Sequence, residues 1–216
     1  LGKELVNKIL SGERNFSGIR LEEGFDLSSY EGFNELQNYL RGQNLRDSPI
    51  NFGDSELIGI SAEGLYLPYL IARGVNFEKS YLDKSNFNGA DFSGANLKKA
   101  NFWKAKIDRG DFRKANIERA YLAAASLLGA NFEYANLERT DLVGADLMIA
   151  NFENANLKGA NFWKARMSGA NLSKSQSKGA CFGNADLEGA NLEKAYLEGA
   201  DFRKAKLSRA NLGLAN

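Results

Sequence analysis

The chain has 216 residues and a formal net charge of +1, from 28 basic and 27 acidic side chains. Because neither sign dominates, the composition argues against a nucleic-acid footprint and against an acidic surface that mimics nucleic acid. Histidine is absent and Cys181 is the single cysteine, which excludes His-based catalytic pairs, most zinc sites and an internal disulfide. No run of about 18 apolar residues occurs, so we expect no membrane contact and a soluble cytoplasmic protein. A targeting peptide removed during maturation is the alternative for its location.

Residues 1–13 are predicted to form a helical cap. Apolar residues recur at helical spacing between residues 3 and 11, and Gly12 follows at the point where a helix commonly ends. Repeat proteins cover their terminal units with such elements. We therefore expect a short amphipathic helix over one end of the structure that follows.

Residues 14–49 are predicted to form an irregular first coil that a helix interrupts. Phe16 and Leu21 lie five residues apart, a spacing that becomes regular further along the chain. Ser28 and Glu31 have the spacing of a capping box, and apolar residues then recur at helical spacing. We expect a helical insertion at about 29–41.

Residues 50–216 follow a period of five residues. From Phe77 to Leu212 the central position of each pentad is apolar in 27 of 28 cases, with Ser177 as the exception. The position two residues earlier is Ala in 22 of the same 28 pentads. At Ser177 we expect a bulge, a water or a local loop, because a buried hydroxyl without a partner is costly.

The period of five excludes both common secondary structures. In a helix, a step of five residues rotates the side chain by about 140°, which would scatter the apolar centres around all sides. In a flat strand, an odd period would send successive centres to opposite sides. The chain must therefore bend once per pentad, so that each straight edge contributes one large and one small side chain to a shared interior.

The motif Ala-Asn/Asp-Leu/Phe-x-x resembles that of the pentapeptide-repeat family, with a strong match from Phe77 to Leu212. The resemblance implies an all-β solenoid, a right-handed quadrilateral β-helix with four pentads per turn, here with a short N-terminal helical cap. The opening helix and the residues Gly12 to Phe16 are also similar to the start of several cyanobacterial members.

Two identical pentads suggest a contact surface. Residues 101–105 and 161–165 both read Asn-Phe-Trp-Lys-Ala and, at twenty residues per turn, lie on one face. Trp103 and Trp163 follow apolar centres and should point outward, and Tyr81 and Tyr121 share that face. Exposed aromatic residues beside cations are typical anchors for a protein partner. The alternative is local: each indole covers only a corner and the aliphatic part of a lysine.

A second candidate surface is predicted on the next face. Leu128 and Met148 occupy outward positions in adjacent coils, with Ile149 beside Met148 and Val143 just before the corner. A cluster of apolar residues on an otherwise charged surface commonly marks a surface that contacts a partner. The alternative is that these four residues are isolated exposed apolar side chains without a binding role.

We therefore predict a non-enzymatic scaffold that binds a protein partner, with no cofactor, no metal site and no nucleic acid. The Asn and Asp residues before the centres are interpreted as structural ladders. By resemblance, the alternative is a DNA-mimicking protein that binds DNA gyrase, although the +3 charge of residues 50–216 departs from an acidic mimic. A purely structural or oligomer-forming rod is a third possibility. The C-terminal coil around Leu207, Leu212 and Leu214 needs a cover, which predicts either a homodimer at this end or further residues folded over it.

Overall fold

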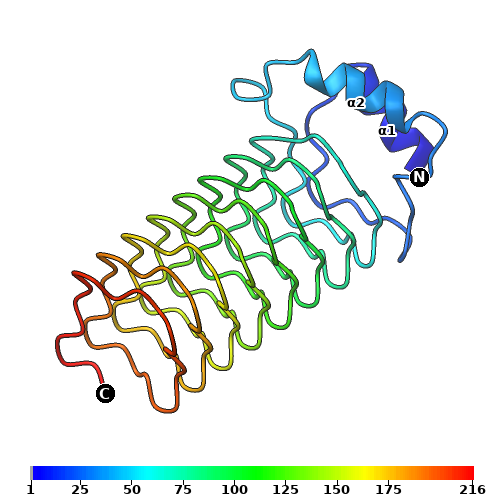
Figure 1. The fold of residues 1–216 in the computed structure, drawn as a ribbon. Coiled ribbons are helices and arrows are strands. Elements are labelled where there is room, and N and C mark those ends of the chain that lie inside the picture. Colours follow the sequence, from blue (N-terminus) through cyan, green and yellow to red (C-terminus); the bar gives the residue numbers. More distant parts are fainter. Residues whose placement is uncertain (1) are drawn as a thin grey trace.

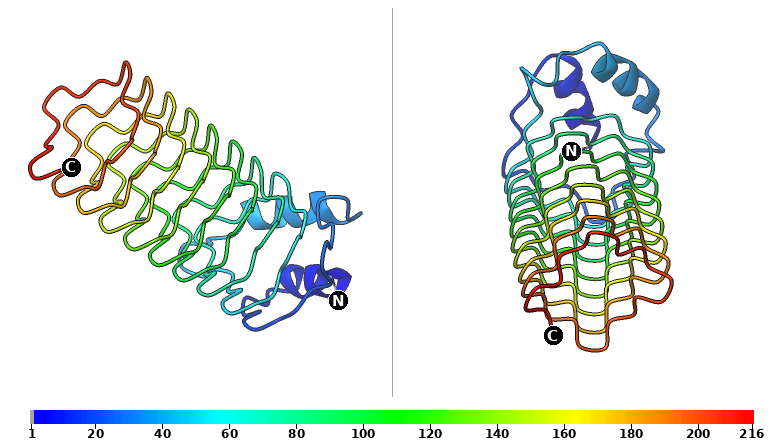
Figure 2. Two further views of the ribbon diagram at one scale, coloured as in Figure 1. Left: turned by 90° about the horizontal axis from the view of Figure 1, so that it is seen from below. Right: turned by 60° about the vertical axis from the view of Figure 1, so that its left-hand side comes forward.

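Each coil of the molecule consists of four pentads, and parallel β-bridges join residues twenty positions apart, such as Asn51 with Ile71 and Asn76 with Asn96. The computed structural model describes residues 2–216, and its coils stack into a rod with two helices at one end and the C-terminus at the other (Figure 1). Seen nearly along the rod, the coils superpose in outline (Figure 2). The prediction of an all-β, right-handed, four-sided solenoid with a helical cap is confirmed.

The second residue after each centre, most often Gly, Lys or Arg, forms the corner of the coil. Every residue at this position from Asp54 to Leu214 has a positive φ, between 53° and 71°. Many of the turns close through a hydrogen bond to the carbonyl of the centre, as from Ala95 N to Phe92 O at 3.0 Å. A β-turn with a positive φ at its third residue favours glycine there, because other residues are strained in this region.

The interior is formed by columns of apolar centres. Phe92, Phe112, Phe132 and Phe152 are fully buried and lie on one another, with centroid separations of 5.3, 4.7 and 4.8 Å between successive rings. The interplanar angles are 16°, 8° and 3°, so the rings are nearly parallel. The predicted stacking of centres twenty residues apart is confirmed, and it places every residue that follows a centre on the outside.

The buried Ser177 does not disturb the coil. Its N–H donates to Tyr196 O at 2.8 Å and its carbonyl accepts the usual turn bond from Ala180 N, so the expected bulge or local loop is wrong. The reason is Ser175, which replaces the usual Ala and whose Oγ lies 2.8 Å from the Ser177 Oγ. The two hydroxyls satisfy one another within a single pentad.

Asparagine side chains form ladders along the outside of the rod. In the column that contains Asn131, Asn151, Asn171, Asn191 and Asn211, each Nδ2 from Asn151 onward donates to the Oδ1 of the residue one coil earlier, at 3.0 to 3.3 Å. The same Oδ1 atoms accept backbone N–H bonds two residues further along, as from Glu153 to Asn151. These amides therefore stabilise the coils.

The cap contains α1 (Gly2–Leu10) and α2 (Phe33–Arg41). The first helix was expected at 3–11 and the second at about 29–41, so α2 begins four residues later than predicted. The expected capping box does not form, because Gly32 occupies the N-cap and the Ser28 hydroxyl donates to Asp26 instead. Both helices lie at the same end of the rod (Figures 1 and 2). No helix among residues 2–216 is long and apolar enough to cross a membrane.

The first coil has three edges, and α2 contributes the fourth. Bridges pair Asn15, Arg20 and Asp26 with the first complete coil. The next edge of that coil begins at Tyr66, whose N–H donates to the side-chain Oε1 of Gln37 in α2 at 2.7 Å. A side chain thus replaces a backbone partner, and the helix that carries it covers the end of the apolar interior.

Candidate functional site

Trp103 and Trp163 project outward from one column of the solenoid. The preceding centres, Phe102 and Phe162, are fully buried, so the next side chain must point away from the interior. The backbone N–H of Trp103 donates to Asn101 Oδ1 at 3.0 Å, which fixes the backbone at the start of the turn. The two indoles are 38% and 39% exposed, values that show half-covered rings rather than free ones.

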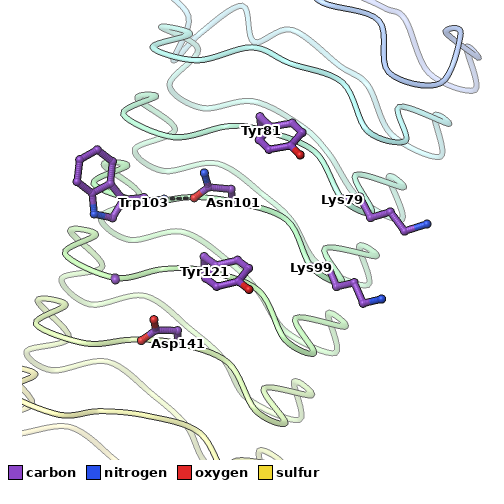
Figure 3. Close-up of a pocket in the computed structure, with 8 residues that line it drawn as sticks. Lys79, Tyr81, Lys99, Asn101, Trp103, Tyr121 and Asp141 are labelled. Atoms are coloured by element: carbon purple, nitrogen blue, oxygen red, sulfur yellow. Dashed lines mark hydrogen bonds between the residues drawn. The ribbon is translucent and has the colours of Figure 1, made fainter.

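Three of the predicted aromatic residues line one groove. Tyr81, Trp103 and Tyr121 surround an open groove of about 570 Å³, together with Lys79, Lys99, Asn101, Ala123 and Asp141 (Figure 3). Backbone bridges place Asn101 between Tyr81 and Tyr121 on successive coils. Because asparagine is much shorter than tyrosine, the middle coil forms the floor. Figure 3 shows Trp103 beyond this floor on one side and the two lysines at the other edge.

Cations surround the groove. The Nζ of Lys104 lies 4.2 Å from the centroid of the Trp103 ring, and the Nζ of Lys84 lies 5.6 Å from it. Lys84 also bonds to Glu63, and this hydrogen bond raises the pKa of Lys84 above its ordinary value. Within the described chain, Lys99 and Lys104 form no ion pair. These two ammonium groups remain available to an anionic ligand.

Trp163 lies three coils from Trp103 and outside the groove. Its indole packs under Lys164, whose Nζ is 4.0 Å from the ring centroid. In place of the two tyrosines, the coils on either side present Asp141 and Cys181. The predicted common face is therefore divided into an aromatic groove at one Trp and an isolated indole at the other.

The second predicted surface is smaller than the sequence suggested. Leu128 and Met148 are half-buried, and the guanidinium of Arg166 lies 3.2 Å from the Met148 sulfur. Ile149 is 66% exposed and has a φ of 53°, a conformation that is strained for a β-branched residue. Val143 belongs to the Trp column, because Gly144 N bonds to Trp163 O and Ala124 N bonds to Val143 O. It lies between the indoles rather than with the other three residues.

Family models match most of the solenoid. The model described as a pentapeptide repeat region matches residues 115–192, and that described as pentapeptide repeats, in eight copies, matches residues 73–107 and 178–216. The chain belongs to the pentapeptide repeat family.

Solved pentapeptide repeat proteins share the fold. HetL, involved in heterocyst differentiation regulation in the cyanobacterium Nostoc sp. strain PCC 7120, superposes with a TM-score of 0.62 and 23% identity, over 96% of this chain and 95% of that one. A trypsin-treated form of QnrB1, a plasmid-mediated fluoroquinolone resistance protein, superposes with a TM-score of 0.57 and 17% identity, over 89% and 90%. No curated protein sequence matches the chain. At these identities the likeness shows the fold, and function must be argued from this chain's own surface.

Five of the residues that line the groove were not predicted from the sequence: Lys79, Lys99, Asn101, Ala123 and Asp141. Asn101 and Asp141 fit the family motif and therefore carry no signal by themselves. Their importance comes from their neighbours, since a short residue forms a hollow only when tall residues flank it one coil away. The twenty-residue alignment of the coils contains this information, and Lys99 could have been found as the residue at the preceding corner.

Across residues 2–216, no three His, Cys, Asp or Glu side chains are grouped closely enough to hold a metal ion. Cys181 is partly buried and free of a disulfide. The chemistry that the groove offers is aromatic contact, hydrogen bonding and positive charge, which together are suited to binding.

Proposed function

We propose that this pentapeptide repeat protein is a non-enzymatic scaffold that binds a protein partner and serves a regulatory role. The groove at Tyr81, Trp103 and Tyr121 is the observation that carries the proposal. Tyr and Trp dominate the energetics of many protein interfaces because they bury large areas with little loss of conformational freedom. A rigid rod also holds such residues in fixed positions, which lowers the entropic cost of binding.

The ionisable groups support a role without catalysis. In the described residues, hydrogen bonds and nearby opposite charges shift several pKa values, and each shift favours the charged form. The pKa is lowered at Asp26, Asp91, Glu118 and Asp201 and raised at Lys8, Arg73, Lys84, Arg113, Lys174 and Arg203. A general acid or base needs a pKa near the working pH, and these shifts move away from it. The free thiol of Cys181 fits a reducing compartment, and we propose the cytoplasm.

Partner capture from the native host tests this function. We expect a protein retained by the wild-type rod to be lost with Trp103→Ala and kept with Tyr134→Ala. Tyr134 is the matched control, because it is an exposed aromatic residue that does not line the groove. Capture that Trp103→Ala leaves unchanged would contradict a scaffold that works through this face.

The alternative function is binding to DNA gyrase as a mimic of duplex DNA. The family resemblance of the repeat motif suggests it, but the net charge of +1 and the lysines around the groove do not suit a DNA mimic. We expect no inhibition of gyrase in a supercoiling assay at micromolar protein. Strong inhibition would favour this alternative over the scaffold.

We also propose that two rods associate through the C-terminal coil. Leu212 and Leu214 are 43% and 79% exposed at this end, and Leu207 is half-buried. A two-fold contact would cover these residues on both chains at once. Light scattering should give twice the chain mass of 23.7 kDa, falling to the monomer mass with Leu212→Lys. A wild-type monomer at tens of micromolar would rule out this contact and leave a purely monomeric rod.

A further inference from the structure

We propose that the groove receives an extended acidic segment of the partner, with one aromatic side chain seated between Tyr81 and Tyr121. The inference rests on the proposed function and adds the chemistry of the partner to it. Three properties of the groove support it: the separation of the two tyrosines, the distribution of charge, and the cover of one face of the Trp103 ring by Lys104.

The spacing of the coils suits one aromatic ring. Tyr81 and Tyr121 lie two coils apart, and a strand separation of about 4.8 Å places their backbones about 9.6 Å from one another. A ring over Asn101 would lie about 4.8 Å from each tyrosine position, within the range of about 4.5–7 Å that aromatic pairs favour. An α-helix, with a diameter of about 10–12 Å including side chains, is too wide to enter this gap. The groove therefore selects a side chain from an extended segment.

The floor residue Asn101 already makes hydrogen bonds of its own. Asn101 Oδ1 accepts the Trp103 N–H at 3.0 Å, and Asn101 Nδ2 lies 3.4 Å from Asp83 Oδ1. The guest side chain consequently needs no strong polar group at its centre. An apolar ring fits this floor better than a charged head does.

Charge selects carboxylates on either side of the ring. Lys79 and Lys99 line one edge of the groove. At the other edge, the ammonium groups of Lys84 and Lys104 lie near the Trp103 ring. The carboxylates near these lysines are Glu63 and Glu78, which pair with Lys84 and Lys79, Glu118, which pairs with Lys98, and Asp83 and Asp141. Since Lys99 and Lys104 keep unpaired ammonium groups among the described residues, a segment with acidic residues flanking the aromatic one is complementary.

A protein segment fits better than a single nucleic-acid strand. Stacking of bases needs open aromatic faces beside a continuous positive track. One face of the Trp103 ring is taken by Lys104 at 4.2 Å, and Asp83 and Asp141 interrupt the track that a phosphate backbone would follow. A phosphate backbone carries a negative charge at every nucleotide, whereas a peptide can carry carboxylates beside the lysines and uncharged residues beside the aspartates.

A random peptide library displayed on phage tests the proposal. Selection on the wild-type rod should enrich segments in which one aromatic residue is flanked by Asp or Glu. A synthetic peptide of the enriched sequence should bind at least about tenfold more weakly to Tyr121→Ala and to Lys99→Glu, and also to Trp103→Ala and Lys104→Glu in the first Asn-Phe-Trp-Lys-Ala pentad. Its affinity should also fall as salt concentration rises, because exposed charges are screened.

The second Asn-Phe-Trp-Lys-Ala pentad provides the matched controls. Trp163→Ala and Lys164→Glu remove the same side chains outside the groove and should leave peptide affinity unchanged within about twofold. Enrichment of neutral or basic peptides, no enrichment, equal losses at the two pentads, or tighter binding of an oligothymidine strand would each overturn the proposal. If a partner captured from the host depends on Trp103 while no acidic motif emerges, the proposed function stands and this inference fails.

Discussion

Residues 101–105 and 161–165 have the same five amino acids and nearly the same local structure. Their phenylalanines are fully buried, and their asparagines accept the Trp N–H at 3.0 and 3.1 Å. The lysines have φ values of 55° and 58° and lie 4.2 and 4.0 Å from the indole centroids. By every local measure the two pentads are equivalent.

The two pentads differ in what lies one coil above and below them. Tyr81 and Tyr121 flank the first pentad, whereas Asp141 and Cys181 flank the second. Only the first therefore borders a groove. In this fold the pentad determines the conformation, and residues twenty positions away determine the binding surface.

The largest expected effect tests the equivalence of the interiors. Phe102→Ala and Phe162→Ala should each lower the free energy of unfolding by about 3–5 kcal/mol, because each leaves a cavity among packed aromatic rings. Phe102 has ring neighbours at 5.9 and 6.2 Å, and Phe162 has them at 5.1 and 5.7 Å. Denaturant titration measures the change, with Glu133→Ala as a control that should cost under about 0.5 kcal/mol. Losses that differ by more than twofold would show that the two interiors are not equivalent.

A second prediction transfers the groove. Asp141→Tyr, Cys181→Tyr and Gly159→Lys together give the second pentad the flanking tyrosines and the corner lysine of the first. We expect isothermal titration to show two peptides bound per rod in place of one, using the peptide selected on the wild-type protein. The positions tolerate these residues, since Tyr81, Tyr121 and Lys99 occupy the same places in other coils.

Adding Trp163→Ala to this triple variant should remove the second site and keep the first. A triple variant that binds only one peptide would mean that the tyrosines and the lysine are insufficient, and that the groove depends on features of its own coils. The comparison of the two pentads would then need a further difference to explain it.

Much of the fold could be predicted because the five-residue pattern of large and small apolar residues directly determines the local backbone and the interior. The apolar centres keep a fixed spacing of five residues, and the turn of four pentads that the family resemblance implies places Phe112 and Phe132 in one column. Every corner from Asp54 to Leu214 adopts a positive φ, and glycine, which tolerates it, recurs there. These features depend on residues within one pentad or at a fixed step of twenty.

The remainder depends on contacts that a period does not describe. At Ser177 the decisive partner was Ser175, an equally unusual residue that also needed a hydrogen bond. The start of α2 was missed because Asp26 binds Ser28 and Ser29, which withdraws the expected cap from the helix. The groove was predicted only through its tall aromatic residues, since its floor is formed by an ordinary Asn101.

The smallest expected effect concerns an interaction that lies within one pentad. The guanidinium of Arg203 and its backbone N–H both bond to the Asp201 carboxylate, and they lower the pKa of Asp201 from 3.8 to about 2. A carboxyl whose pKa is lower in the folded state adds stability above its unfolded pKa, and this contribution is lost as pH falls from about 4 to about 2. Because Asp201 is only partly buried and the Arg203 side chain is 88% exposed, solvent screens the pair and the effect on unfolding is small. In Arg203→Ala, carbon NMR titration of the Asp201 carboxyl should show a pKa raised only part of the way to 3.8, because the backbone N–H remains as a donor.

Peptide binding at the groove should stay unchanged in Arg203→Ala, since the Asp201–Arg203 pair acts inside its own pentad. An unchanged pKa would mean that the side-chain pair is not formed in solution, and a loss of peptide binding would show that interactions local to one pentad also shape the distant surface.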